Sequence, residues 1–288
     1  MKKIICLIAA FVLAIPAFSA TFQEVNAFIK EKKWSDAEKS CRELISEIKK
    51  PADVFIAYNK LMMIMRRQNK NAELIADADA FLANCKNDQH AAAILIYKGI
   101  AQRAVKQRVE SLDTFKLAVD KAKDGYSARE AAFYFIDTAP SVKKYAEAQE
   151  MYNRAAKFKG ADKDARLHAA GSYAFFYDRK YDEGLAILDK LDAIENLSVG
   201  YKETSLRYRG NIFAYKKNHQ EAIKCYDKAL ELKLDAYREG RITWFKAQSL
   251  EKLGKKAEAL ECYKKAAAYK GDAYFQRNSV MMIKKLEK

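Results

Sequence analysis

The chain has 288 residues, of which 50% are hydrophobic and 32% charged, and its formal net charge is +15. This length is enough to bury a large core. Only ten glycines and three prolines are present. Because the turns of β-rich folds need these residues repeatedly, the composition argues against such folds. Long runs of Ala, Lys, Glu and Leu, which are strong helix formers, favour an all-α fold instead.

Residues 1–19 have the three-part layout of a secretory signal peptide. Two lysines precede an apolar run that ends at Ile15, and small residues follow Pro16. The run is too short to span a bilayer comfortably, and Cys6 lies too early in it to be the acylated cysteine of a lipoprotein. We expect cleavage after Ser19 and a periplasmic or secreted bacterial protein, with no integral membrane span once the signal is removed.

The predicted mature chain, 20–288, is basic. Removing Lys2 and Lys3 leaves 51 Lys and Arg against 38 Asp and Glu, a formal charge of 51 − 38, or +13. Such a charge attracts anionic partners. The lysines are nevertheless scattered in pairs along the chain and mixed with Glu and Asp, which is typical of solvated helix faces, and this interpretation is preferred over specific anion binding.

The first predicted hairpin contains the segment "VNAFIKEKKWSDAEKSCRELI", with Ala37, Cys41 and Leu44 on one helix face. Ser35 and Glu38 have the spacing of a capping box, so we expect Ser35 to cap the second helix and Glu38 to return the bond.

The same residue pattern recurs along the chain. A small residue is followed four and seven residues later by apolar ones, as in Ala222, Tyr226 and Ala229. The anchor positions are separated by 35, 39, 37, 36, 38 and 37 residues, and they are Ala37, Ala72, Ser111, Ala148, Gly184, Ala222 and Ala259. A small side chain lets two antiparallel helices approach, and a large side chain four residues later fills the wedge beside it. One hairpin cannot bury both faces, so the pattern predicts a stack of hairpins, that is, a solenoid.

The last two units resemble the tetratricopeptide repeat family at its signature positions. The residues that carry the resemblance are Gly210, Phe213, Ala222, Tyr226 and Ala229, and then Ala247, Leu250, Ala259, Tyr263 and Ala266. The resemblance implies a superhelical solenoid of about seven helical hairpins in a single domain over 20–288. The period is longer than the usual 34 residues of this family, and most units lack its closing proline. The segment 271–288, with Val280, Ile283 and Leu286, is predicted to be a capping helix.

The sequence offers little catalytic or metal-binding chemistry. It contains no phosphate-binding glycine loop, no HExxH, no Gly-x-Ser-x-Gly and no CxxC pair. Glu110 and Ser111 resemble the catalytic glutamate region of lytic transglycosylases, but the downstream Gly-Leu-Met-Gln segment of that family is absent. The four mature cysteines, Cys41, Cys85, Cys225 and Cys262, are expected to be buried and mostly free thiols. We predict a protein that is not an enzyme and needs no cofactor or metal.

In repeat arrays of this family the first helix of each unit lines a concave groove. Projecting that register onto this chain gives ten groove candidates: Arg103, Arg166, Tyr173, Tyr177, Arg207, Asn211, Tyr215, Arg241, Trp244 and Gln248. Arg, Tyr and Trp are the side chains that most often dominate interface energies. The alternative is that the aromatic members are core residues.

We therefore expect an exported interaction scaffold that binds a peptide segment of a cell-envelope protein, with acidic segments favoured and no role for nucleic acid. Two alternatives remain open. One is a binding module for anionic glycan or peptidoglycan, and the other is an enzyme with a divergent lytic site at Glu110.

Overall fold

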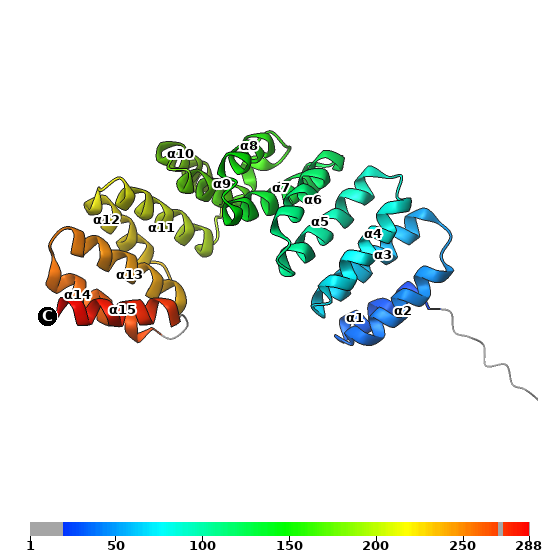
Figure 1. Cartoon of the computed structure of the whole chain (residues 1–288), viewed down its shortest axis with the longest axis horizontal. Coiled ribbons are helices and arrows are strands. Elements are labelled where there is room, and N and C mark those ends of the chain that lie inside the picture. Colours follow the sequence, from blue (N-terminus) through cyan, green and yellow to red (C-terminus); the bar gives the residue numbers. More distant parts are fainter. Residues whose placement is uncertain (1–19, 270–272, 288) are drawn as a thin grey trace, which may run out of the picture. The chain divides into compact units, whose positions relative to one another are not determined.

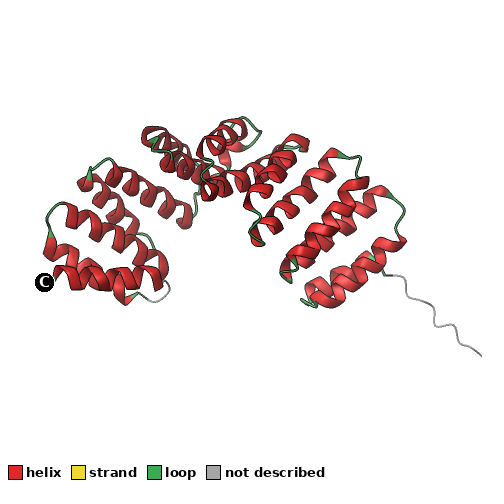
Figure 2. Ribbon diagram, in the orientation of Figure 1, coloured by secondary structure: helices red, strands yellow, loops and turns green. Residues whose placement is uncertain are grey.

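The computed structural model describes residues 20–269 and 273–287. The predicted signal peptide and its cleavage site lie outside the described residues. Within these residues all regular structure is helical, with no strand (Figure 2), so the predicted all-α class is confirmed. None of the described helices is long and apolar enough to cross a membrane.

Fourteen of the fifteen α-helices in the described residues form seven antiparallel hairpins, and α15 follows the last hairpin (Figure 1). The predicted helical repeat array of about seven hairpins with a capping helix is thereby confirmed. The helices are α1 (Phe22–Lys30), α2 (Trp34–Glu47), α3 (Pro51–Arg67), α4 (Asn71–Asn84), α5 (Asp88–Ala104), α6 (Arg108–Lys121), α7 (Gly125–Thr138), α8 (Tyr145–Ala155), α9 (Ala165–Tyr177), α10 (Tyr181–Asp192), α11 (Val199–Tyr215), α12 (His219–Leu230), α13 (Ala236–Lys252), α14 (Lys256–Ala268) and α15 (Ala273–Leu286). Two short 3₁₀ helices, η1 (Ala139–Val142) and η2 (Ala161–Lys163), lie in connections.

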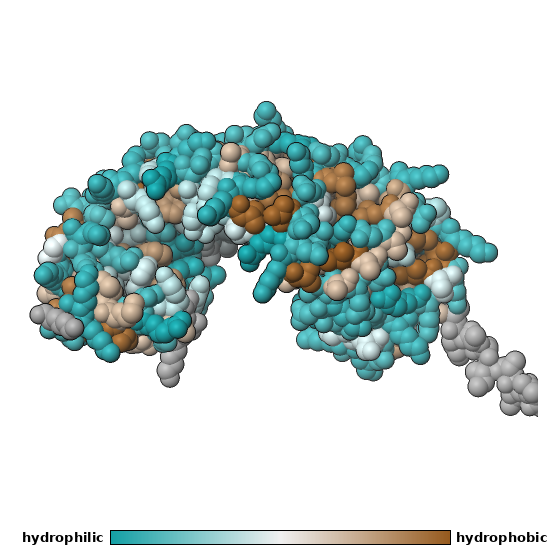
Figure 3. Space-filling model, viewed as in Figure 1, coloured by the Kyte–Doolittle hydropathy of each residue, from teal (hydrophilic) through white to brown (hydrophobic). Residues whose placement is uncertain are grey.

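The described residues divide into two compact units, with the boundary between Phe81 and Leu82 near the end of α4. Unit 1 contains α1 to α3 and most of α4, and unit 2 contains α5 to α15. The prediction that 20–288 forms one continuous domain stays a prediction. Much of the visible surface of both units is hydrophilic (Figure 3), as solvated helix faces require.

The anchor residue of the second hairpin was predicted wrongly as Ala72. In the other six hairpins the anchor is the fourth residue of the second helix, and in α4 that residue is Leu74. Leu74 is fully buried, whereas Ala72 is exposed. With Leu74 as anchor, the separations from Ala37 and to Ser111 are both 37 residues, so the period is more regular than the sequence pattern indicated.

Each hairpin turn repeats at the same period. A residue with positive φ stands two residues before every second helix, and these residues are Lys32, Asn69, Lys106, Lys143, Arg179, Lys217 and Gly254. The left-handed conformation reverses the chain in few residues and normally favours glycine. Only Gly254 has that residue type, which is why the turns are inconspicuous in the sequence.

The predicted capping box at the start of α2 does not form. Lys33 is the N-cap residue, no side chain caps the helix, and Ser35 lies inside it. Glu38 is instead buried and accepts hydrogen bonds from Arg42 (3.1 Å), Gln68 (2.9 Å) and Lys70 (2.8 Å). Burial disfavours ionisation of Glu38, but these three donors outweigh it and lower its pKa. Glu38 therefore joins three helix ends of unit 1 instead of capping one helix.

In two hairpins of unit 2, a glycine of the first helix lies where an aromatic side chain of the second helix crosses it. A Cβ added at Gly99 would lie 2.4 Å from the Phe115 ring, and one at Gly210 would lie 2.4 Å from the Tyr226 ring. Both rings are buried. The expected packing of a small residue against a large aromatic is therefore present.

Two of the three apolar residues predicted for the capping helix pack against the core, and the third does not. Met282, Ile283 and Leu286 pack against the core cluster around Tyr263, whereas Val280 is exposed. Val280 was therefore assigned to the wrong face, because Ser279, a polar residue, is the fully buried one.

The four described cysteines are free thiols, as expected. Cys41 and Cys225 are also buried as expected, but Cys85 and Cys262 are only half-buried. Burial raises the pKa of the Cys41 thiol to about 11, and its Sγ donates a hydrogen bond to the Ala57 carbonyl at 3.2 Å. Since the thiolate is the reactive form, we expect iodoacetamide at pH 8 to label the half-buried Cys85 first and Cys41 last. Peptide mass spectrometry of timed samples measures this order, and equal labelling before denaturation would contradict it.

Candidate functional site

Two adjoining pockets lie along the helices that begin each hairpin of unit 2. The larger, which we call the aromatic pocket, has a volume of about 980 Å³ and is lined by α9, α11, α12, α13, α15 and the turn before α12. The smaller, which we call the arginine pocket, has a volume of about 730 Å³ and is lined by α5, α7, η1, α9, α11 and α13. The pockets share Tyr173, Tyr177, Arg207, Tyr208 and Arg241, so together they form one groove.

All ten groove candidates line this groove. Arg103 and Arg166 line the arginine pocket. The other eight line the aromatic pocket, and they are Tyr173, Tyr177, Arg207, Asn211, Tyr215, Arg241, Trp244 and Gln248. The structure thus brings the candidates together on one surface, whose role in binding stays a prediction.

The deepest charged group beneath the groove is Glu203 on α11, whose side chain is 1% exposed. Its Oε1 accepts from Arg207 Nε at 2.8 Å and from Arg241 Nη2 at 3.0 Å. Burial disfavours the charge of Arg207, but the neighbouring Tyr208 and Glu203 raise its pKa overall. Two guanidinium groups share one carboxylate, so one positive charge of this cluster is not balanced within it.

The other two arginines of the groove are more exposed than Arg207 and Arg241 and lie near other carboxylates. Arg103 Nη2 lies 2.7 Å from Asp137 Oδ2, and Arg166 Nε lies 3.8 Å from Asp164 Oδ1. Both also lie against rings: Arg103 is 5.8 Å from the Tyr134 centroid, and Arg166 is 5.3 Å from that of Phe133. Such stacking fixes the planar groups while leaving N–H donors for a ligand.

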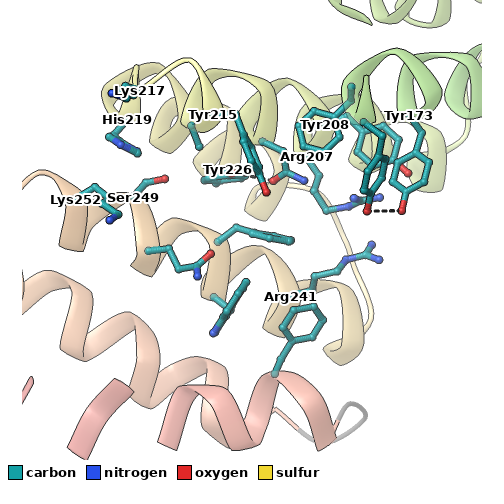
Figure 4. A pocket seen from close by; sticks show the side chains of 18 of the residues that line it. Tyr173, Arg207, Tyr208, Tyr215, Lys217, His219, Tyr226, Arg241, Ser249 and Lys252 are labelled. Atoms are coloured by element: carbon teal, nitrogen blue, oxygen red, sulfur yellow. Dashed lines mark hydrogen bonds between the residues drawn. The ribbon is translucent and has the colours of Figure 1, made fainter. Parts of the chain in front are cut away.

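Tyrosine rings form the wall common to the two pockets. Tyr173 stacks on Tyr208 with centroids 5.5 Å apart, and Tyr177 stacks on Tyr145 at 6.0 Å. The Tyr173 hydroxyl donates to that of Tyr177 at 2.8 Å (Figure 4). Burial and the Tyr177 hydroxyl raise the pKa of Tyr173, so its hydroxyl stays protonated at neutral pH.

Basic side chains predominate around the groove. The two linings together contain one acidic residue, Asp137, against six Lys or Arg, which are Arg103, Arg166, Arg207, Lys217, Arg241 and Lys252. Figure 4 shows Lys217 and Lys252 with His219 at one end of the aromatic pocket, away from Arg207. Burial and the nearby Lys252 lower the pKa of His219.

Sequence reasoning missed several lining residues. Tyr201, Tyr208, Asn211 and Tyr215 follow one helical face of α11, but the predicted register began at Arg207 and omitted Tyr201 and Tyr208. The i, i+7 spacing of three tyrosines was the available signal. Lys217 and the α15 residues that line the pocket could not be found from helix register, because they belong to a turn and to the capping helix.

The lytic hypothesis gains nothing from the geometry. Glu110 is exposed on α6 and lines neither pocket. Ser111 is buried, and its hydroxyl donates to the Arg108 carbonyl at 2.7 Å. Across residues 20–269 and 273–287, no group of three or more His, Cys, Asp or Glu side chains could hold a metal ion.

Comparison with known proteins identifies the repeats. Residues 204–235 and 241–273 each match a tetratricopeptide repeat model, and no curated protein matches the chain. The fold is similar to that of a tetratricopeptide repeat protein from Parabacteroides merdae (15% identity, TM-score 0.62), over 92% of this chain and 97% of that one. It is also similar to the C-terminal part of a repeat-containing protein from Cytophaga hutchinsonii (12% identity, TM-score 0.63), over 89% of this chain and 98% of that one. Pseudomonas aeruginosa PilF shares the fold at 15% identity and a TM-score of 0.55, over 70% of this chain and 85% of that one.

At these identities the solved structures show the fold alone, whereas the two matched segments carry the signature residues of the family. Gly210, Ala222 and Tyr226 of the first segment occupy the helix crossing described above. Residues 204–235 and 241–273 are therefore tetratricopeptide repeats.

Proposed function

We propose that this protein is an exported, non-enzymatic scaffold that binds an acidic segment of a cell-envelope protein in the groove of unit 2. The tetratricopeptide repeat fold is typical of protein–protein interaction scaffolds. The observation that carries the proposal is the excess of six basic side chains over one acidic side chain around the groove. Carboxylates are the complementary groups, because Arg binds them through paired N–H donors.

The export part of the proposal rests on residues 1–19. Their basic start, apolar run and small residues before position 20 are those of a secretory signal. An envelope protein is then the partner available to the mature chain.

An anionic glycan is the second candidate ligand, favoured by the exposed tyrosine rings in the groove, since flat apolar faces also pack on sugar rings. Retention on purified cell wall that falls steeply with added salt would support this candidate. Retention unaffected by salt would contradict a charge-driven mode of glycan binding.

The structure determines which basic residues are suitable for a test. Reversing the charge of Arg207 or Arg241 would place carboxylates beside the buried Glu203, so lost binding could reflect unfolding. Lys217 and Lys252 are exposed, line the aromatic pocket and make no ion pair within the described residues. They can therefore be reversed with little effect on the fold.

The test compares capture of envelope proteins by the purified chain and by a Lys217→Glu/Lys252→Glu variant. We expect capture of acidic-segment proteins to fall at least tenfold, on the order of two lost charge contacts in a groove. A Lys224→Glu/Lys265→Glu variant has the same net charge, and both side chains are exposed and belong to neither lining. If both variants lose capture equally, the net charge rather than the groove is responsible and the proposal fails.

A further inference from the structure

The aromatic pocket exposes large rings that a solvated groove does not need. Tyr215 is 66% exposed, Tyr274 57% and Tyr177 45%, and all three line this pocket. Scattered exposed apolar residues need no explanation, but a concentration of them in a concavity marks a binding surface.

Rings dominate the lining as a whole. Ten of its nineteen residues are aromatic, four are Lys or Arg, and none is Asp or Glu. The rings come from five helices, α9, α11, α12, α13 and α15, and they are Tyr173, Phe176, Tyr177, Tyr208, Tyr215, Tyr226, Trp244, Phe245, Tyr274 and Phe275. An occupant that only carried carboxylates would leave this apolar surface in contact with water.

The rings are held in place by one another. Tyr215 meets Phe176 edge to face, with centroids 5.0 Å apart and planes at 84°. Tyr226 stacks on Phe245 at 6.1 Å, and its hydroxyl donates to Asn211 Oδ1 at 2.8 Å. Because these contacts fix the ring orientations before a ligand arrives, little side-chain entropy is lost on binding.

We propose that the aromatic pocket receives an aromatic side chain of the bound acidic segment, and that Lys217 and Lys252 contact carboxylates beside that side chain. This inference rests on the proposed function and specifies the ligand further. A ring inserted among edges and faces of other rings gains more than its buried area alone provides. The volume of about 980 Å³ leaves room for one such side chain and the adjacent main chain.

The charge of the pocket supports an acidic flank over a basic one. Lys217 and Lys252 lie at one end of the pocket, and no carboxylate is among its lining residues. The buried Glu203 beneath it is shared by Arg207 and Arg241. A cationic segment, which could also pack on tyrosine faces, would be repelled here. The preferred motif is therefore an aromatic residue with Asp or Glu on at least one side.

A random peptide library displayed on phage, selected against the immobilised purified chain, tests the inference. We expect enriched peptides to contain Phe, Tyr or Trp within a few residues of two or more acidic residues. A synthetic copy of the most enriched peptide, labelled for fluorescence anisotropy, should lose at least tenfold in affinity when its aromatic residue is replaced by alanine, and at least tenfold against a Tyr215→Ala variant.

Tyr215 is suited to this change because its side chain is largely exposed, and an unchanged melting temperature verifies that the variant is folded. A matched control is Tyr126→Ala, which removes a tyrosine that is 60% exposed and lines neither pocket. Binding should be the same for this control and the unmodified chain.

The outcomes separate this inference from the proposed function. Selection of acidic peptides without an aromatic residue, or with an aliphatic one in its place, would overturn the inference and leave the proposed binding of acidic segments in the groove intact. Selection of no acidic peptides, together with retention on cell wall that Tyr215→Ala abolishes, would overturn both in favour of a glycan ligand.

Discussion

Replacing Glu203 with glutamine is expected to lower the free energy of unfolding of unit 2 by about 3–5 kcal/mol, the usual result of breaking a buried ion pair. Glu203 is 1% exposed and Arg207 10% exposed, so the Arg207 charge would be left buried without a counterion. Arg241, which shares the same carboxylate oxygen, would lose its partner as well.

The two tryptophans make the measurement specific to one unit. Trp34 lies in α2 of unit 1 and Trp244 in α13 of unit 2. In a Trp34→Phe background, urea unfolding followed by tryptophan fluorescence therefore reports on unit 2, and unfolding transitions in repeat arrays need not be shared by the whole chain.

An exposed ion pair provides the control for Glu203→Gln. Lys216 Nζ lies 2.6 Å from Asp182 Oδ1, but the Asp182 side chain is 81% exposed, so Asp182→Asn should cost no more than about 1 kcal/mol. Equal losses of unfolding free energy from Glu203→Gln and Asp182→Asn would contradict the claim that burial makes the Glu203 ion pair costly to break. A Glu203→Leu/Arg207→Met double variant should recover part of the lost stability, because it no longer leaves the Arg207 charge buried without a counterion, while Arg241, which is 18% exposed, still lacks its partner.

Replacing Gly210 with alanine is expected to destabilise unit 2 by about 1–3 kcal/mol through overpacking. The added Cβ would lie 2.4 Å from the Tyr226 ring, which is 1% exposed and cannot move aside. The clash outweighs the gain of up to about 1 kcal/mol that alanine normally brings to a helix interior.

Gly200→Ala, on the same helix, is the matched control. Its Cβ would meet no heavy atom closer than Arg238 Nη2 at 3.5 Å, so this change should stabilise the protein by about 0.4–1 kcal/mol. In a Tyr226→Leu background the cost of Gly210→Ala should fall sharply, since the clashing ring is absent. A cost unchanged by Tyr226→Leu would show that the helix crossing does not depend on this contact.

The sequence was sufficient for the fold class because the packing rule repeats. Six hairpins place a small residue such as Ala37 or Ala148 at the same helix position, and all of these positions are buried. The second hairpin was misassigned because the large Leu74 occupies that position. Its helix keeps the repeat spacing, with Leu74, Ala78 and Phe81 buried, but it starts from a large residue. The turn at Asn69 gives no further signal, because its positive φ is not encoded by a glycine.

The groove was predictable in outline and not in its electrostatics. Helix register placed Arg207 and Arg241 on the correct surface, but it could not show that both bind Glu203, which lies one turn before Arg207 on α11 and 38 residues before Arg241. Pairing of this kind depends on how deeply each side chain is buried and on contacts between neighbouring hairpins. Neither follows from residue spacing within one helix. The same limit applies to Lys217 and Lys252, whose side chains become neighbours of the groove only after the hairpins stack.

The central claim is that the groove of unit 2 binds an acidic segment of another protein, and site-specific photocrosslinking in the native cell tests it most directly. A photoreactive amino acid at Tyr215, in the groove, is compared with one at Lys224, which is exposed on α12 outside it. We expect the Tyr215 probe alone to crosslink a partner, at a stretch rich in Asp and Glu identified by mass spectrometry. Crosslinks from Lys224 to the same partner with none from Tyr215, or crosslinks from Tyr215 only to basic segments, would contradict the claim.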